Sequence, residues 1–168
     1  LCMAGQYGFA PQRIFSFNGA LEPIHGNAIF APLARLLFVN PFVPRLFALR
    51  ARFGDIAEFV LSKTGSDIDA TGKQCYRTLL QSSEHVEGAL GMMANWDLDQ
   101  LKRLYPDLQV PVILVAAEND LTVPASVSRR AAALLPNSQF ILLPQGGHLL
   151  HEVEWREMAK LISDADKK

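Results

Sequence analysis

Residues 111–152 read PVILVAAENDLTVPASVSRRAAALLPNSQFILLPQGGHLLHE, and their pattern of apolar runs and turn residues predicts the fold class. Residues 111–117 form a continuous apolar run, which is typical of a strand buried on both faces of a parallel sheet. Proline at position 124 and good helix formers after it predict a helix over 124–135, and a second strand is predicted over 139–143. Strand, helix and strand in this order predict an α/β fold with parallel strands.

The two ends of the chain extend the same pattern. Residues 13–21 (RIFSFNGAL) are a short apolar run between prolines and predict a third buried strand. Residues 1–8 are typical of the last turns of a helix, and residues 149–164 predict an amphipathic helix that closes the chain. The sequence starts without methionine, so we expect it to be a fragment of a longer protein.

The segment between the first two strands interrupts this alternation. Helices are predicted there over residues 27–38, 44–53, 56–63, 70–81 and 83–95. An insertion of this length between two core strands is too long for a connection and predicts a helical cap. We therefore expect a core segment over residues 1–22, a cap over 23–106 and the remaining core over 107–168.

Composition excludes several classes of function. Sixteen basic and seventeen acidic residues leave a net charge of −1, so no overall field attracts nucleic acid. Cys2 and Cys75 stand alone, which predicts neither a disulfide framework nor a zinc site and is typical of the cytoplasm. No apolar run is long enough for a transmembrane segment. His148 and His151 lack a third ligand nearby, so we expect no metal site and no cofactor.

Two loops carry the candidate chemistry, and each follows the carboxyl end of a predicted strand. Asp120 lies in AENDLTVP, and His148 follows a glycine pair in QGGHLLHE. Because adjacent parallel strands bring these loops together, we expect the carboxylate to orient the imidazole for catalysis as a base. The alternatives are a turn or N-cap role for Asp120, an ordinary loop histidine at position 148, and a supporting or capping role for His151.

AENDLTVP, a helix, a strand and QGGHLLHE together resemble the closing half of an α/β-hydrolase, with Ala117 in place of the usual glycine. The resemblance covers residues 1–168 and implies that the three strands are the family's strands 6 to 8, with the cap between strands 6 and 7. It implies that Asp120 and His148 are two members of a Ser-His-Asp triad. The family's nucleophile elbow, G-x-S-x-G, does not occur in the sequence. We therefore expect the nucleophile upstream of Leu1 and no activity from these residues alone.

A narrower resemblance comes from the cap. Four stretches resemble the magnesium-chelatase accessory proteins of bacteriochlorophyll biosynthesis: FNGALEPI, APLARLLFVNPFVPRLFALRA, GSDIDATGKQCYRTLL and HVEGALGMMANWDLDQL. The resemblance implies magnesium chelatase as a partner, a magnesium-porphyrin intermediate as the amphiphilic small-molecule substrate, and a place at the periphery of photosynthetic membranes. The cap is rich in phenylalanine and arginine, which indicates either an ordinary cap core or a surface for an anionic amphiphile or membrane headgroups.

Three hypotheses of function remain open from the sequence. The first is a serine-type hydrolase in which Asn95 and Trp96 line the substrate pocket, with a role in packing alone as the alternative for Trp96. The second is a non-catalytic porphyrin-binding or accessory protein that does not use the triad residues. The third is an enzyme like epoxide hydrolases or dehalogenases, with an aspartate nucleophile, because MMANWDL is similar to their cap exits.

Overall fold

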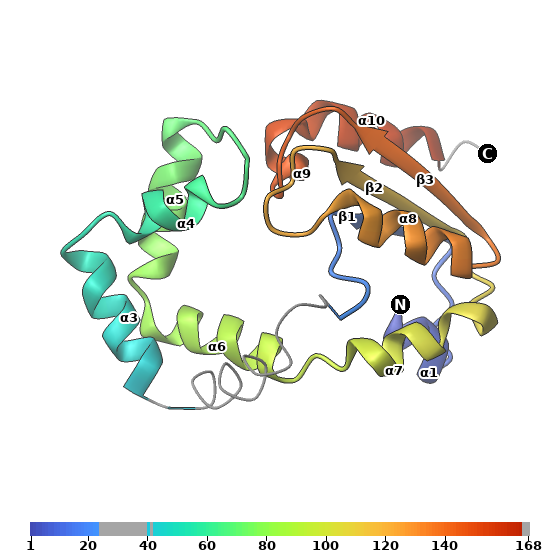
Figure 1. Ribbon diagram of the computed structural model, residues 1–168, viewed down its shortest axis with the longest axis horizontal. Coiled ribbons are helices and arrows are strands. Elements are labelled where there is room, and N and C mark those ends of the chain that lie inside the picture. The colour runs from blue at the N-terminus through green and yellow to red at the C-terminus, as the bar shows by residue number, and fades with distance from the viewer. Residues whose placement is uncertain (24–39, 41, 166–168) are drawn as a thin grey trace. The chain divides into compact units, whose positions relative to one another are not determined.

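The computed structural model describes residues 1–23, 40 and 42–165 (Figure 1). Strands β1 (Ile14–Phe17), β2 (Val112–Ala117) and β3 (Ser138–Leu143) form a sheet in the order β1-β2-β3. Both pairings are parallel, which confirms the α/β class predicted from the sequence. Strand β1 is shorter than the predicted range 13–21, because the backbone turns at Asn18, where φ is +47°.

The central strand β2 is buried on both faces of the sheet. Val112 and Leu114 pack in one apolar cluster with Val127 and Ala131 of helix α8 (Ala125–Leu134). Ile113, Val115 and Ala117 belong to a second cluster with Leu150 and Met158. Figure 1 shows α8 on one face of the sheet and α10 on the other. The continuous apolar run 111–117 is therefore explained by burial between two helical layers.

The second cluster is closed by two short helices, α9 (Leu150–Val153) and α10 (Trp155–Ala165). The sequence predicted one helix over 149–164, and the structure divides it at Glu154, where φ is −104° and ψ is +36°. Leu150 and Met158, on either side of this break, are both buried in the same cluster.

Three further elements belong with the sheet. Helix α1 (Cys2–Gln6) agrees with the predicted end of a helix and is followed by Gly8 at φ +65°. Helix α7 (Leu98–Arg103) and the 3-10 turn η1 (Tyr105–Asp107), which the sequence analysis did not predict, bring Leu101 and Tyr105 into the first cluster.

The insertion between β1 and β2 is helical. It contains α3 (Phe42–Arg52), α4 (Ile56–Ser62), α5 (Ala70–Leu80) and α6 (Ser83–Ala94), close to the predicted ranges. Side-chain oxygens cap the last two: Asp69 accepts from Gly72 N at 2.7 Å, and Ser82 accepts from His85 N at 3.2 Å. The helix predicted over 27–38 lies outside the described residues.

Residue contacts divide the chain into two compact units. The sheet unit comprises Leu1–Pro23, Thr64–Asp67 and Leu98–Lys168, and the helical unit comprises Ile24–Lys63 and Ile68–Asp97. The four-residue segment Thr64–Asp67 thus groups with the sheet although it lies inside the predicted cap. The predicted boundaries at residues 22 and 106 stay a prediction. Among the helices described, none has the length and apolarity that crossing a membrane requires.

Candidate active site

The carboxyl ends of β2 and β3 bring Asp120 and His148 together. His148 Nδ1 lies 2.9 Å from Asp120 Oδ2. The Asp120 side chain is fully buried, whereas 29% of the His148 side chain is exposed. This is the juxtaposition that the sequence analysis expected from two neighbouring strand ends, and its catalytic use stays a proposal.

The Asp120 carboxylate is held by the backbone that follows it. Its Oδ1 accepts hydrogen bonds from Thr122 N at 2.7 Å and Val123 N at 2.9 Å. These bonds fix the carboxylate plane and direct Oδ2 toward the imidazole. Asp120 therefore makes a turn like the one that the sequence analysis offered as its alternative role, and the same turn aims its second oxygen at His148.

The pairing fixes the tautomer of His148. Because the carboxylate oxygen is the acceptor, the proton lies on Nδ1 and Nε2 keeps its lone pair. Within the described part of the chain, Nε2 has no hydrogen-bond partner. Nε2 is therefore the ring nitrogen that is free to accept a proton from another group.

The glycine pair before His148 allows a close backbone contact. Gly146 has φ +116° and Gly147 has φ +62°, a region that favours glycine. A Cβ on Gly147 would lie 2.3 Å from the carbonyl carbon of Gly65 and 2.4 Å from Ser66 N. No residue with a side chain fits at position 147 without moving the backbone that packs there.

Asn18 joins all three strand ends. It is 2% exposed, and its Nδ2 donates to the carbonyl oxygens of Gly147 at 2.6 Å and His148 at 2.9 Å. Its Oδ1 accepts from Ala117 N at 2.9 Å. One side chain from the end of β1 therefore fixes the end of β2 and the loop that carries the imidazole.

Sequence reasoning did not single out Asn18 or the segment Thr64–Asp67. For Asn18 a signal existed, because it directly follows a strand, at the sheet edge where parallel α/β sheets assemble their sites. For Ser66 no sequence signal was available: GSD between two helices is typical of an ordinary turn.

The other candidate residues are placed as follows. Asn95 follows α6, where its Nδ2 donates to Gly91 O at 2.8 Å, and the neighbouring Trp96 is 48% exposed. Both belong to the helical unit, and their contact with substrate stays a prediction. The His151 ring stacks on Phe17 with centroids 6.5 Å apart, and its Nε2 lies 3.7 Å from Glu152 Oε1. In the described chain no three His, Cys, Asp or Glu side chains are grouped to hold a metal ion.

A buried carboxylate stabilises the sheet unit beyond this pair. Glu22 Oε1 accepts from Arg130 Nε at 2.7 Å, and Lys102 Nζ lies 3.7 Å from Glu22 Oε2. The hydrogen bond to Glu22 raises the pKa of Arg130. Burial, with the Glu22 charge as a smaller cause, raises the pKa of Tyr105, whose hydroxyl donates to Leu21 O.

Comparison with known proteins decides the family. The family described as alpha/beta hydrolase fold matches residues 43–154. The chain belongs to the α/β-hydrolase fold family. A solved hydrolase-fold protein from Burkholderia ambifaria superposes with a TM-score of 0.73 at 15% identity, over 97% of this chain and 60% of that one.

Two curated relatives match nearly the whole chain. The magnesium-chelatase 30 kDa subunit of Rhodobacter capsulatus is 41% identical over 158 residues, which is 90% of this chain and 54% of that protein. The uncharacterized hydrolase YugF of Bacillus subtilis is 27% identical over 164 residues, 93% of this chain and 54% of that protein. The chain thus spans about half the length of both relatives.

Proposed function

We propose that Asp120 and His148 are the acid and the base of a hydrolytic triad whose nucleophile lies outside these 168 residues. One observation carries the proposal: a fully buried carboxylate, fixed by two backbone N–H groups, holds Nδ1 of a partly exposed imidazole at 2.9 Å. This is the arrangement in which an imidazole removes a proton from a nucleophile through Nε2.

The chemistry follows from this arrangement. Nε2 takes the proton of the attacking hydroxyl, and Asp120 stabilises the imidazolium that results. Nε2 then returns the proton to the leaving group, so that one residue serves as base and acid in turn. An aspartate nucleophile, the third hypothesis from the sequence, would use the same pair to activate the water that hydrolyses the ester intermediate.

The relatives support a more specific role for the intact protein. The 41% identity with a magnesium-chelatase 30 kDa subunit supports an accessory role beside magnesium chelatase in bacteriochlorophyll biosynthesis. The substrate in this proposal is a magnesium-porphyrin intermediate, and magnesium chelatase is the protein partner.

Hydrolysis by the intact protein tests the triad. We expect His148→Ala to lower kcat for activated p-nitrophenyl esters by about 10³-fold or more, with Asp120→Asn close behind. His85→Ala is the matched control, because His85 lies exposed on α6. Unchanged hydrolysis in His148→Ala would contradict the proposal.

A second candidate function is porphyrin binding without catalysis, and one feature of the helical unit favours it. A hollow of about 580 Å³ is lined mainly by aromatic and aliphatic side chains, with two charged ones, Arg50 and Asp55; the aromatic ones are Phe47, Phe53 and Phe59. Apolar rings suit a macrocycle, and a guanidinium suits its carboxylates. Porphyrin titration separates the two functions: binding that is weakened by Arg50→Ala, with function intact in His148→Ala, supports the binder.

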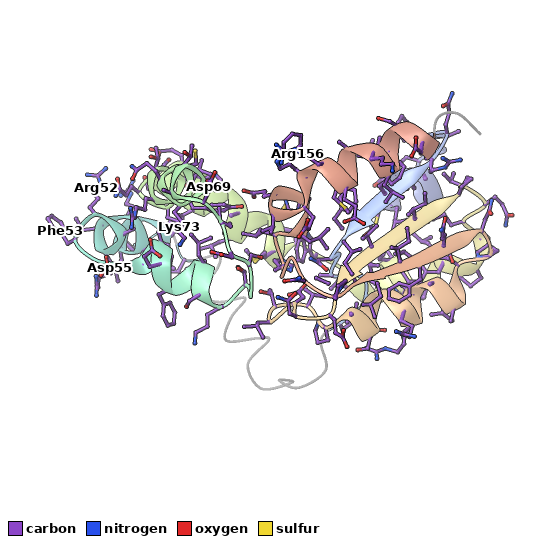
Figure 2. All side chains as sticks on the ribbon, turned by 90° about the horizontal axis from the view of Figure 1, so that it is seen from above. Arg52, Phe53, Asp55, Asp69, Lys73 and Arg156 are labelled. Atoms are coloured by element: carbon purple, nitrogen blue, oxygen red, sulfur yellow. The ribbon has the colours of Figure 1, made fainter. Side chains whose placement is uncertain are left out.

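We also propose that the intact protein binds the surface of a membrane through helix α3. On α3, Phe42, Leu46 and Leu49 are more than half exposed and follow helical spacing along one stripe. The buried residues Pro44, Ala48 and Ala51 lie on the opposite side of the helix. Figure 2 shows Arg52 and Phe53 projecting outward at the end of the same helix.

This surface suits anionic headgroups, because α3 contains three exposed arginines and no acidic residue: Arg45, Arg50 and Arg52. We expect the intact protein to sediment with vesicles that contain anionic lipid and to stay in solution with neutral ones. Leu46→Glu should abolish sedimentation, and Leu134→Glu, an exposed leucine on α8, should not. Equal sedimentation of both variants would contradict this placement.

A further inference from the structure

The segment Thr64–Asp67 lies in the chain between helices α4 and α5, yet it packs with the sheet unit. Its neighbours there are the two loops that carry Asp120 and His148. We call these four residues the bracing segment. Nothing in the catalytic role proposed for Asp120 and His148 requires this segment.

The bracing segment makes hydrogen bonds to the backbone of the His148 loop before, at and after position 148. His148 N donates to Thr64 O at 2.8 Å. The Ser66 hydroxyl donates to Gly146 O at 2.8 Å and accepts from Leu149 N at 2.9 Å. One hydroxyl therefore ties the residue two positions before His148 to the residue directly after it.

The same segment reaches the Asp120 loop. Asn119 Nδ2 donates to Gly65 O at 3.1 Å, and Asn119 Oδ1 accepts from Gly147 N at 2.9 Å. Gly65 has φ +71°, and a Cβ there would lie 2.3 Å from Asn119 O. The three backbones approach so closely that glycine stands at both points of contact, Gly65 and Gly147.

We propose that the bracing segment positions the His148 imidazole and that Ser66 is the positioning residue within it. The proposal rests on the catalytic role proposed for His148. The Ser66 hydroxyl touches no reacting atom and acts by restraining the backbone from which the imidazole projects. In the chain, the segment directly joins the stretches that carry α4 and α5.

The experiment compares three serine variants of the intact protein. Ser66→Ala removes the hydroxyl, and Ser66→Thr keeps it. Ser163→Ala is the matched control, because Ser163 is an exposed residue of α10 whose Oγ donates to Ala159 O. Three quantities are measured: kcat and KM for ester hydrolysis, hydrogen exchange at Leu149 N, and the NMR signal of the hydrogen-bonded Nδ1 proton of His148.

In Ser66→Ala we expect kcat to fall at least about 10-fold with KM unchanged, and Leu149 N to exchange about 10-fold faster. The Nδ1 proton signal should broaden or disappear. Ser66→Thr should restore all three properties, and Ser163→Ala should change none. If Ser66→Ala leaves both kcat and the Nδ1 signal unchanged, the proposal is wrong.

Failure of the catalytic role itself would be seen separately. In that case His148→Ala would hydrolyse esters at the wild-type rate. The Nδ1 proton signal and the rate of hydrogen exchange at Leu149 N would then decide whether Ser66 positions the ring. A normal Nδ1 signal in Ser66→Ala would then overturn the proposal, and a lost signal restored by Ser66→Thr would support it.

Discussion

Asn18 gives the most exacting test of how the strand ends are held together. Asn18→Ala removes two hydrogen bonds to the His148 loop and one from Ala117 N. The N–H of Ala117 is then buried without a partner, which costs about 1–3 kcal/mol. The loss of each hydrogen bond to the carbonyl oxygens of Gly147 and His148 costs about 1 kcal/mol more. Alanine at φ +47° adds about 1 kcal/mol of backbone strain. We expect a total loss of about 4–6 kcal/mol in the free energy of unfolding.

Two comparison variants separate the causes. Asn18→Gly loses the same hydrogen bonds but accepts the positive φ, so it should be about 1 kcal/mol more stable than Asn18→Ala. Asn137→Ala removes an exposed asparagine whose Nδ2 donates to Gln109 O at 3.3 Å and should cost less than about 0.5 kcal/mol. Urea unfolding of the intact protein, followed by circular dichroism, measures each value.

A cost below about 1 kcal/mol for Asn18→Ala, which is the average for any point substitution, would show that Asn18 does not hold the strand ends together. An equal cost for Asn137→Ala and Asn18→Ala would likewise contradict the prediction, because the burial of Asn18 at the strand ends would then not matter.

Three further substitutions test the packing of the sheet unit by the same unfolding measurement. Gly147→Ala should destabilise by at least about 2 kcal/mol, because its Cβ meets the Gly65 backbone. Gly88→Ala, at an exposed position of α6 where a Cβ meets nothing within 4 Å, should be neutral or stabilising. Equal effects of the two substitutions would contradict the close approach of the Gly147 and Gly65 backbones. Tyr105→Phe should cost about 1–2 kcal/mol at pH 7 by removing the donor to Leu21 O. Burial raises the Tyr105 pKa, so the folded state favours the neutral phenol; the resulting stability is present below about pH 10 and is lost as the pH rises further. The phenylalanine variant should therefore lose less free energy of unfolding than the wild type above about pH 10. Parallel curves of stability against pH for the two proteins would contradict the raised pKa. Ser128→Ala should leave stability unchanged or raise it by about 1 kcal/mol, since its buried hydroxyl has no partner in the part of the chain described, and a loss above about 1 kcal/mol would indicate a partner.

The sheet and the Asp120–His148 juxtaposition were predictable because both follow from local patterns. A strand buried on both faces needs a continuous apolar run, and residues 111–117 supply one. Parallel neighbours then force their carboxyl-end loops to the same edge, whatever the intervening helix contains. The glycine pair before His148 likewise predicted a sharp turn, and the structure adds its cause, the Gly65 backbone.

The interactions that secure the loop were not predictable for a physical reason. Ser66 lies between two helices of the insertion, and its hydrogen bonds join residues about eighty positions apart. No periodicity encodes such a contact, because a polar side chain in a turn looks the same whether it meets solvent or another loop. The break at Glu154 was missed for a similar reason: apolar spacing continues through it, and only the backbone angles show two helices.

Asp120 and His148 are proposed to act as one unit, and a double-mutant cycle on the intact protein measures whether they do. Asp120→Ala, His148→Ala and the double variant are compared by kcat/KM for ester hydrolysis. If the carboxylate works only through the imidazole, the double variant loses no more activity than His148→Ala alone. Losses that multiply, or single variants as active as the wild type, would contradict the claim.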